Sequence, residues 1–103
     1  MSHDLAEKTT GLASRVNNLA VLQTGVDSRA LLEQQDRLAK LALVAIVKDL
    51  DAEADEYKAA IKGLDEAIEF IGEAQRKIQD VAKAIRLVKK AADLVEKAIT
   101  KFG

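Results

Sequence analysis

The sequence predicts an all-α fold, an antiparallel helical bundle in which a short N-terminal helix packs on a long helical hairpin. Three observations indicate this fold. The composition is rich in Ala, Leu, Lys and Glu and contains no proline, which is typical of long uninterrupted helices. Apolar residues recur in sevens along the second half of the chain, and two glycine-containing turns divide it. At 103 residues the chain is expected to form one domain.

The first helix is expected at about 5–23, where apolar residues recur with helical spacing. The second and third are expected at about 28–62 and 66–102. The boundaries come from a Gly-apolar-Asp sequence that occurs twice, at 25–27 and 63–65. Glycine can end one helix in the left-handed conformation, and aspartate can cap the next.

The third helix carries most of a coiled-coil-like seam that begins at Tyr57 and ends at Phe102. Its fourteen positions are all apolar, and their spacing alternates between three and four residues, which places them along one edge of a helix. They are Tyr57, Ala60, Leu64, Ala67, Ile71, Ala74, Ile78, Val81, Ile85, Val88, Ala92, Val95, Ile99 and Phe102. Because this spacing also continues through Gly63, one long helix through that glycine is the alternative to a turn.

The expected helix lengths leave part of the hairpin without a neighbour. The second and third helices would each extend about 55 Å and the first only about 30 Å, so the hairpin would project as a two-helix prong. The run Leu38–Val47 is apolar nearly all round, and such a helix needs neighbours on several sides. We therefore take Leu43 and Val47 as interface candidates. Packing at the seam and its flank is the simple interpretation of the aromatic residues Tyr57 and Phe70 near the expected tip, and a role as interface anchors is the alternative.

Charge is divided between two blocks of the sequence. Residues 48–73 carry a net charge of −6 and residues 74–103 a net charge of +5, although the whole chain is nearly neutral at −1. In the predicted hairpin the acidic block would lie at the prong tip and the basic block along the base. A solvated surface is the simple interpretation, and charge steering of an assembly is the alternative.

The sequence offers no set of residues for catalysis, metal binding or cofactor binding. It contains no cysteine, and its one histidine is His3. Ser2, Ser14 and Ser28 have no ordinary base partner, and capping of helix starts explains them. A carboxylate-bridged metal site would need Glu-x-x-His pairs on facing helices. We expect no enzyme, no metal and no cofactor.

These observations predict a non-enzymatic protein–protein interaction module, a self-associating helical bundle such as an adaptor, chaperone, immunity protein or assembly subunit. The partner expected is a second copy, with a homodimer favoured, or another protein. The alternative is a membrane-active protein whose hairpin opens on lipid, because residues 81–102 form an apolar face rimmed by lysines. Nucleic-acid binding is not expected at this net charge and with three aromatic residues.

The expected location is the cytoplasm. The first residues lack the basic-then-apolar pattern of a signal peptide, and the longest apolar run, Leu41–Val47, is far shorter than the ~20 residues that span a bilayer. Secretion by a route that needs no signal peptide stays open.

Overall fold

The computed structural model describes residues 3–48, 50–77 and 80–101, and for residues 73–77 it describes the backbone only. Within these ranges it contains four helices and no strand, so the all-α prediction is confirmed. The helices are α1 (Asp4–Ala20), α2 (Gly25–Val47), α3 (Asp55–Lys77) and α4 (Val81–Lys101). The prediction of three helices is therefore wrong, and the corrections concern where the helices end.

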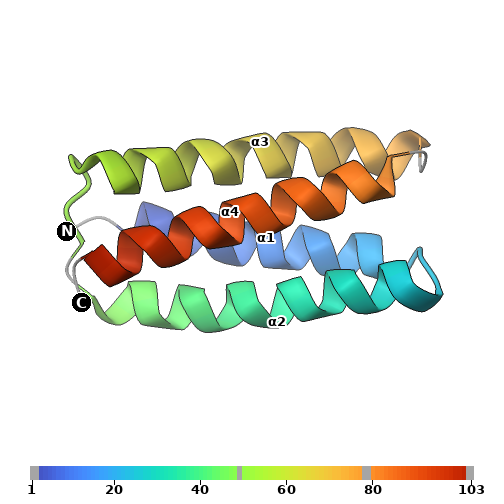
Figure 1. Cartoon of the computed structure of the whole chain (residues 1–103), viewed down its shortest axis with the longest axis horizontal. Helices are drawn as coiled ribbons and strands as arrows, with labels where there is room; N and C mark the ends of the chain where they lie inside the picture. The colour runs from blue at the N-terminus through green and yellow to red at the C-terminus, as the bar shows by residue number, and fades with distance from the viewer. Residues whose placement is uncertain (1–2, 49, 78–79, 102–103) are drawn as a thin grey trace.

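The four helices form a bundle in which successive helices run in opposite directions, so that α1 begins and α4 ends at the same end of the molecule (Figure 1). In the view of Figure 1, α3 lies along the top, α2 along the bottom, and α4 in front of α1 between them. Helix α1 packs on α2 and α3, and α4 packs on the same two helices, whereas α2 and α3 make no contact in the described ranges. Helix α2 is thus an outer helix with neighbours on one side only.

Helices α1 and α4 are central, because they contact each other as well as α2 and α3, and the core lies between these four helices. Helices α1 and α4 each supply eight buried residues, and α2 supplies four. Ten of the fourteen seam residues are buried, and Ile85 is half-buried. Ile78, Phe102 and the side chain of Ala74 lie outside the described part of the chain. The seam residues therefore face the core from two helices, α3 and α4, rather than from one.

The predicted helix 28–62 is wrong because α2 ends at Val47 and α3 begins only at Asp55. Lys48 adopts an extended conformation after α2, and Leu50 is buried, which anchors the connection to the core. Asp51 then forms a turn: its Oδ1 accepts a hydrogen bond from the Glu53 N–H at 2.9 Å, and its carbonyl accepts one from the Ala54 N–H at 3.1 Å. A side chain that bonds nearby backbone in this way competes with helix continuation.

The predicted turn at Gly63 is also wrong, since this glycine lies inside α3. Its role is close packing against α4. A Cβ placed on Gly63 would lie 2.7 Å from Leu94 Cδ1 and 3.7 Å from Ala91 Cα. The alternative of a single long helix through Gly63 is correct only locally, because α3 spans Asp55–Lys77.

The predicted helix 66–102 is divided between α3 and α4. The carbonyl of Asp80 accepts a hydrogen bond from the Ala84 N–H at 3.0 Å, which begins α4. With four helices of similar length the molecule measures 38 × 20 × 16 Å. The ~55 Å hairpin and its two-helix prong therefore do not exist, and the acidic and basic blocks lie side by side on α3 and α4 rather than at opposite ends.

The first turn is close to the expectation, because α1 ends at Ala20 rather than at 23 and α2 follows at Gly25. Gly25 has φ +63°, the left-handed conformation that glycine adopts without steric cost. The Ser28 hydroxyl donates a hydrogen bond to the Ala20 carbonyl at 3.1 Å, which satisfies one acceptor at the end of α1. Val26 is exposed.

Candidate functional site

The feature that most needs a functional explanation is the apolar surface of α2. Of its 23 residues, only Leu31, Leu38, Ala42 and Ala45 are buried. Five of its large apolar side chains stay exposed besides Val26, to between 37% for Val44 and 81% for Val47. They are Leu32, Leu43, Val44, Ile46 and Val47. Single exposed apolar residues are ordinary on protein surfaces, but a group on one helix marks an interaction site.

Most of these residues share one edge of the helix. Leu32, Ala39, Leu43 and Ile46 follow one another at spacings of seven, four and three residues, and Val47 lies beside them. Such spacing aligns side chains along a helix just as it does in a coiled-coil seam. We call these five residues the α2 outer face. Because α2 has neighbours only in α1 and α4, no described helix covers this edge.

The other side of α2 is anchored by an ion-pair cluster. Arg37 Nη2 lies 2.7 Å from Asp93 Oδ1 and 2.9 Å from Glu96 Oε2, both on α4. Burial alone would lower the pKa of Arg37, but the hydrogen bonds to these two carboxylates outweigh it and raise the pKa. Arg37 therefore ties α2 to α4 on the side of the helix away from the α2 outer face.

A pocket extends the α2 outer face onto α1. It has a volume of about 470 Å³ and is lined by His3, Ala6, Glu7, Thr10 and Ile46. Ile46 belongs to both features, and Val47, the most exposed of the large apolar side chains, follows it directly. A side chain of a partner that contacts Ile46 would therefore find a recess next to it, which is the setting in which interface anchors contribute most.

Two of the four residues predicted from the sequence lie on this surface. Leu43 and Val47 are 67% and 81% exposed, and both belong to the α2 outer face. Ala39 and Ile46 fall within the predicted apolar run Leu38–Val47 but are not among the predicted interface residues, and Leu32 lies outside that run. Their spacing of seven, four and three residues is visible in the sequence, but it does not show which edge of the helix the bundle leaves uncovered.

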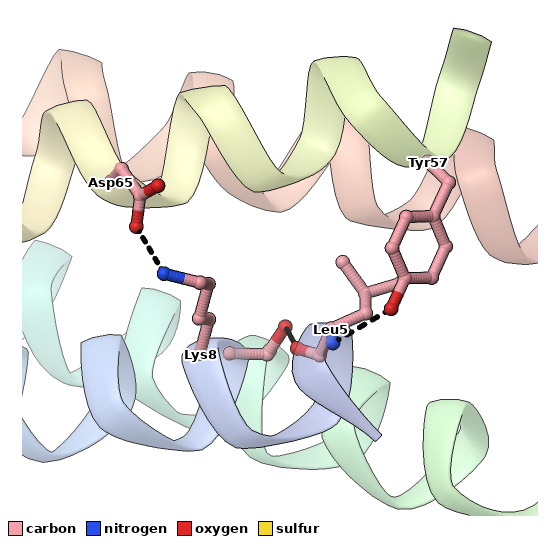
Figure 2. A network of polar contacts seen from close by, with 5 residues as sticks. Leu5, Lys8, Tyr57 and Asp65 are labelled. Carbon is pink, nitrogen blue, oxygen red and sulfur yellow. Dashed lines mark hydrogen bonds and ion pairs between the residues drawn. The ribbon is translucent and has the colours of Figure 1, made fainter. Parts of the chain in front are cut away.

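Tyr57 does not lie at the surface. It is 4% exposed on α3, and its hydroxyl oxygen accepts a hydrogen bond from the Leu5 N–H of α1 at 3.2 Å (Figure 2). In the same view Lys8 Nζ of α1 lies 2.6 Å from Asp65 Oδ1 of α3. Tyr57 therefore joins two helices of the core and is not brought together with Leu43 and Val47.

Phe70 lies elsewhere on the molecule. It is half-buried on α3, with Lys83 Nζ of α4 4.9 Å from the centre of its ring. Together with Glu66, Glu69 and Leu87, these two residues line a second pocket of about 330 Å³. Because the ring is already covered on one side by the lysine, Phe70 offers less free apolar surface than the α2 residues do.

Neither a metal site nor a membrane span is found in the described ranges. No group of three or more His, Asp or Glu side chains there could hold a metal ion. No helix within those ranges is both long and apolar enough to cross a bilayer.

Comparisons with models of protein families, with curated proteins and with solved structures gave no significant match to this chain.

Proposed function

We propose that this protein is a non-enzymatic protein-interaction module that self-associates through the α2 outer face, in the manner of a coiled-coil seam. The observation that carries this proposal is the alignment of exposed Leu32, Leu43, Ile46 and Val47 on the one side of α2 that no described helix covers. Helix pairs associate by burying apolar residues with this spacing. The partner proposed is a second copy, because one such surface can cover another of the same shape.

The apolar surface that a second copy would cover consists of partly exposed side chains. A fully buried Leu, Ile or Val contributes about 1.5–3 kcal/mol, but the α2 side chains are already partly covered in the monomer and gain less. Because association itself costs about 4–15 kcal/mol, we expect a weak dimer that forms as the protein concentration rises.

A lipid surface is the other ligand that an exposed apolar helix could bind, and the charges beside the α2 outer face favour protein. The apolar face of α4 is buried in the bundle, so it could meet lipid only after the bundle opened. Beside the α2 outer face, Asp36 and Lys40 form an ion pair at 2.9 Å. Helices that lie in a membrane interface are typically flanked by cationic residues instead.

The test is the double variant Leu43→Ser, Val47→Ser. Replacing two apolar residues in each copy is expected to raise the dimer Kd about a hundredfold or more, while the melting temperature of the monomer stays the same. Lys62→Ser on α3 is the matched control, because Lys62 is exposed and α3 does not contact α2. Sedimentation velocity across a concentration series measures the change in Kd.

A vesicle assay separates the two ligands. Wild-type protein should stay in the supernatant when vesicles of phosphatidylcholine and phosphatidylglycerol are pelleted. A wild-type protein that is monomeric in solution, and that pellets with vesicles unless Leu43 and Val47 are replaced, would contradict self-association and support the membrane alternative.

A further inference from the structure

A second column of exposed residues runs along α2 beside the α2 outer face and suggests how two copies are oriented. Val26, Glu33, Lys40 and Val47 recur at intervals of seven residues, and all four are exposed. Residues spaced by seven are two helical turns apart and lie nearly in line. The column therefore reads apolar, acidic, basic, apolar along the surface of α2.

This pattern is complementary to itself only when the two helices run in opposite directions. In an antiparallel pair, Val26 of one copy lies opposite Val47 of the other, and Glu33 lies opposite Lys40. A parallel pair would set Glu33 against Glu33 and Lys40 against Lys40 of the second copy. Like charges that face each other across a helix pair are unfavourable, and such flanking charges select partner and orientation.

The α2 outer face agrees with the same alignment. A two-fold axis midway between Asp36 and Arg37, as these two pairings require, brings Leu32 of one copy within about two residues, or ~3 Å along the helix, of the level of Leu43 of the other. Ala39 lies close to the axis, where a small side chain lets two helices approach each other. Within each copy, Lys40 also forms an ion pair with Asp36 at 2.9 Å.

We infer that two copies of this chain pair antiparallel along α2 about a two-fold axis near Arg37, with Val26 against Val47 and Glu33 against Lys40 of the second copy. This inference rests on the proposed function, because it specifies the partner and geometry of the same surface. The arrangement is a closed two-fold dimer in which the same patch is used by both copies. The apolar residues supply affinity, and the charged pair selects direction.

A charge swap tests the pairing of Glu33 with Lys40. Each single variant, Glu33→Lys or Lys40→Glu, replaces two attractive contacts in the dimer by two repulsive ones and is expected to raise the dimer Kd about tenfold at low salt. The double variant Glu33→Lys, Lys40→Glu restores opposite charges across the interface, and its Kd should return to within about threefold of the wild type. Melting curves of each variant show whether the monomer still folds.

Cross-linking tests the direction of the helices independently. The chain contains no cysteine, so Val26→Cys and Val47→Cys each introduce one thiol. With a short bis-maleimide, a mixture of the two variants should give the mixed dimer, and each variant alone should give little. Dimers of each single variant with itself would indicate parallel helices and overturn the inference.

The failure of this inference and that of the proposed function can be told apart. If the charge-swapped double variant stays weak, or if each cysteine variant cross-links to itself, the antiparallel pairing is wrong. The proposed function would still hold as long as Leu43→Ser, Val47→Ser dissociates the wild-type dimer. If the wild type is monomeric at every concentration, self-association and its geometry both fail.

Discussion

Two side chains tie the end of α4 to the start of α3. Lys101 Nζ lies 2.9 Å from Glu56 Oε1 and 2.6 Å from Glu56 Oε2. The hydrogen bond from Lys101 lowers the pKa of Glu56, and the same contact raises the pKa of Lys101. This pair joins the acidic and basic blocks of the sequence at the end of the bundle where α3 begins and α4 ends (Figure 1).

The Glu56 contact predicts a specific loss of stability in acid. A carboxyl whose pKa is lower in the folded than in the unfolded chain stabilises the fold at pH values above its unfolded pKa, and that contribution is lost as the pH falls through the folded pKa. Urea denaturation from pH 7 to pH 3 should show a smaller loss of unfolding free energy for Glu56→Gln than for the wild type. Glu66→Gln, whose carboxylate makes no ion pair with a described residue, serves as the control. An identical pH dependence in the wild type and in Glu56→Gln would contradict the assignment.

Among the helices, apolar periodicity predicted which residues are buried better than it predicted where helices end. The seam residues face the core, yet α3 stops at Lys77 and α4 starts at Val81. The heptad spacing keeps its phase across this break, so periodicity alone could not detect it. Acidic residues, which favour the start of a helix, mark both boundaries in the sequence. Asp51 and Asp80 precede α3 and α4, and Asp55 and Glu56 occupy the first turn of α3.

The glycines show why a turn signal needs its structural context. Gly25 has the left-handed conformation that the prediction requires, although it begins α2 rather than ending α1. Gly63 has the same neighbours in sequence, an apolar residue and aspartate, but its lack of a side chain makes room for Leu94. Sequence alone does not distinguish a glycine needed for backbone conformation from one needed for close packing.

Substitution by alanine tests the packing role of Gly63 against Gly11, a helical glycine with no close neighbour at the Cβ position. Gly11 lies within α1 with open space where a Cβ would be, so Gly11→Ala is expected to raise the unfolding free energy by about 0.5–1 kcal/mol. Gly63→Ala should gain less or lose stability, because the new Cβ would lie 2.7 Å from Leu94 Cδ1 and force it to move. Urea denaturation of the two variants side by side measures the difference. Equal gains would show that the approach of Leu94 is not limiting.

The candidate interface was only partly predictable for a related reason. An apolar run such as Leu38–Val47 shows that a helix needs neighbours, but not which of its edges stays uncovered. That depends on the arrangement of the bundle, in which α2 packs on α1 and α4 but not on α3. Leu43 and Val47 were therefore found from sequence, whereas the assignment of Tyr57 to the same kind of site depended on a prong that does not exist.

For the molecule as a whole, the four-helix arrangement changes the physical basis of the proposed dimer. The sequence had suggested that acidic and basic ends of two copies would attract each other. In the bundle α3 and α4 lie side by side, so acidic and basic residues of the two blocks can meet within one chain, as in the Glu56–Lys101 pair. The case for self-association now depends on the α2 outer face and on the column from Val26 to Val47.

The measurement that tests this account most directly is the mass of the wild-type protein by sedimentation equilibrium from about one to a few hundred micromolar, a range that includes weak self-association. We expect the mass to rise with concentration from 11.2 kDa to twice that value. Higher salt should change the midpoint only slightly, since apolar contacts supply most of the affinity. A mass that stays at 11.2 kDa over the whole range would contradict self-association through the α2 outer face.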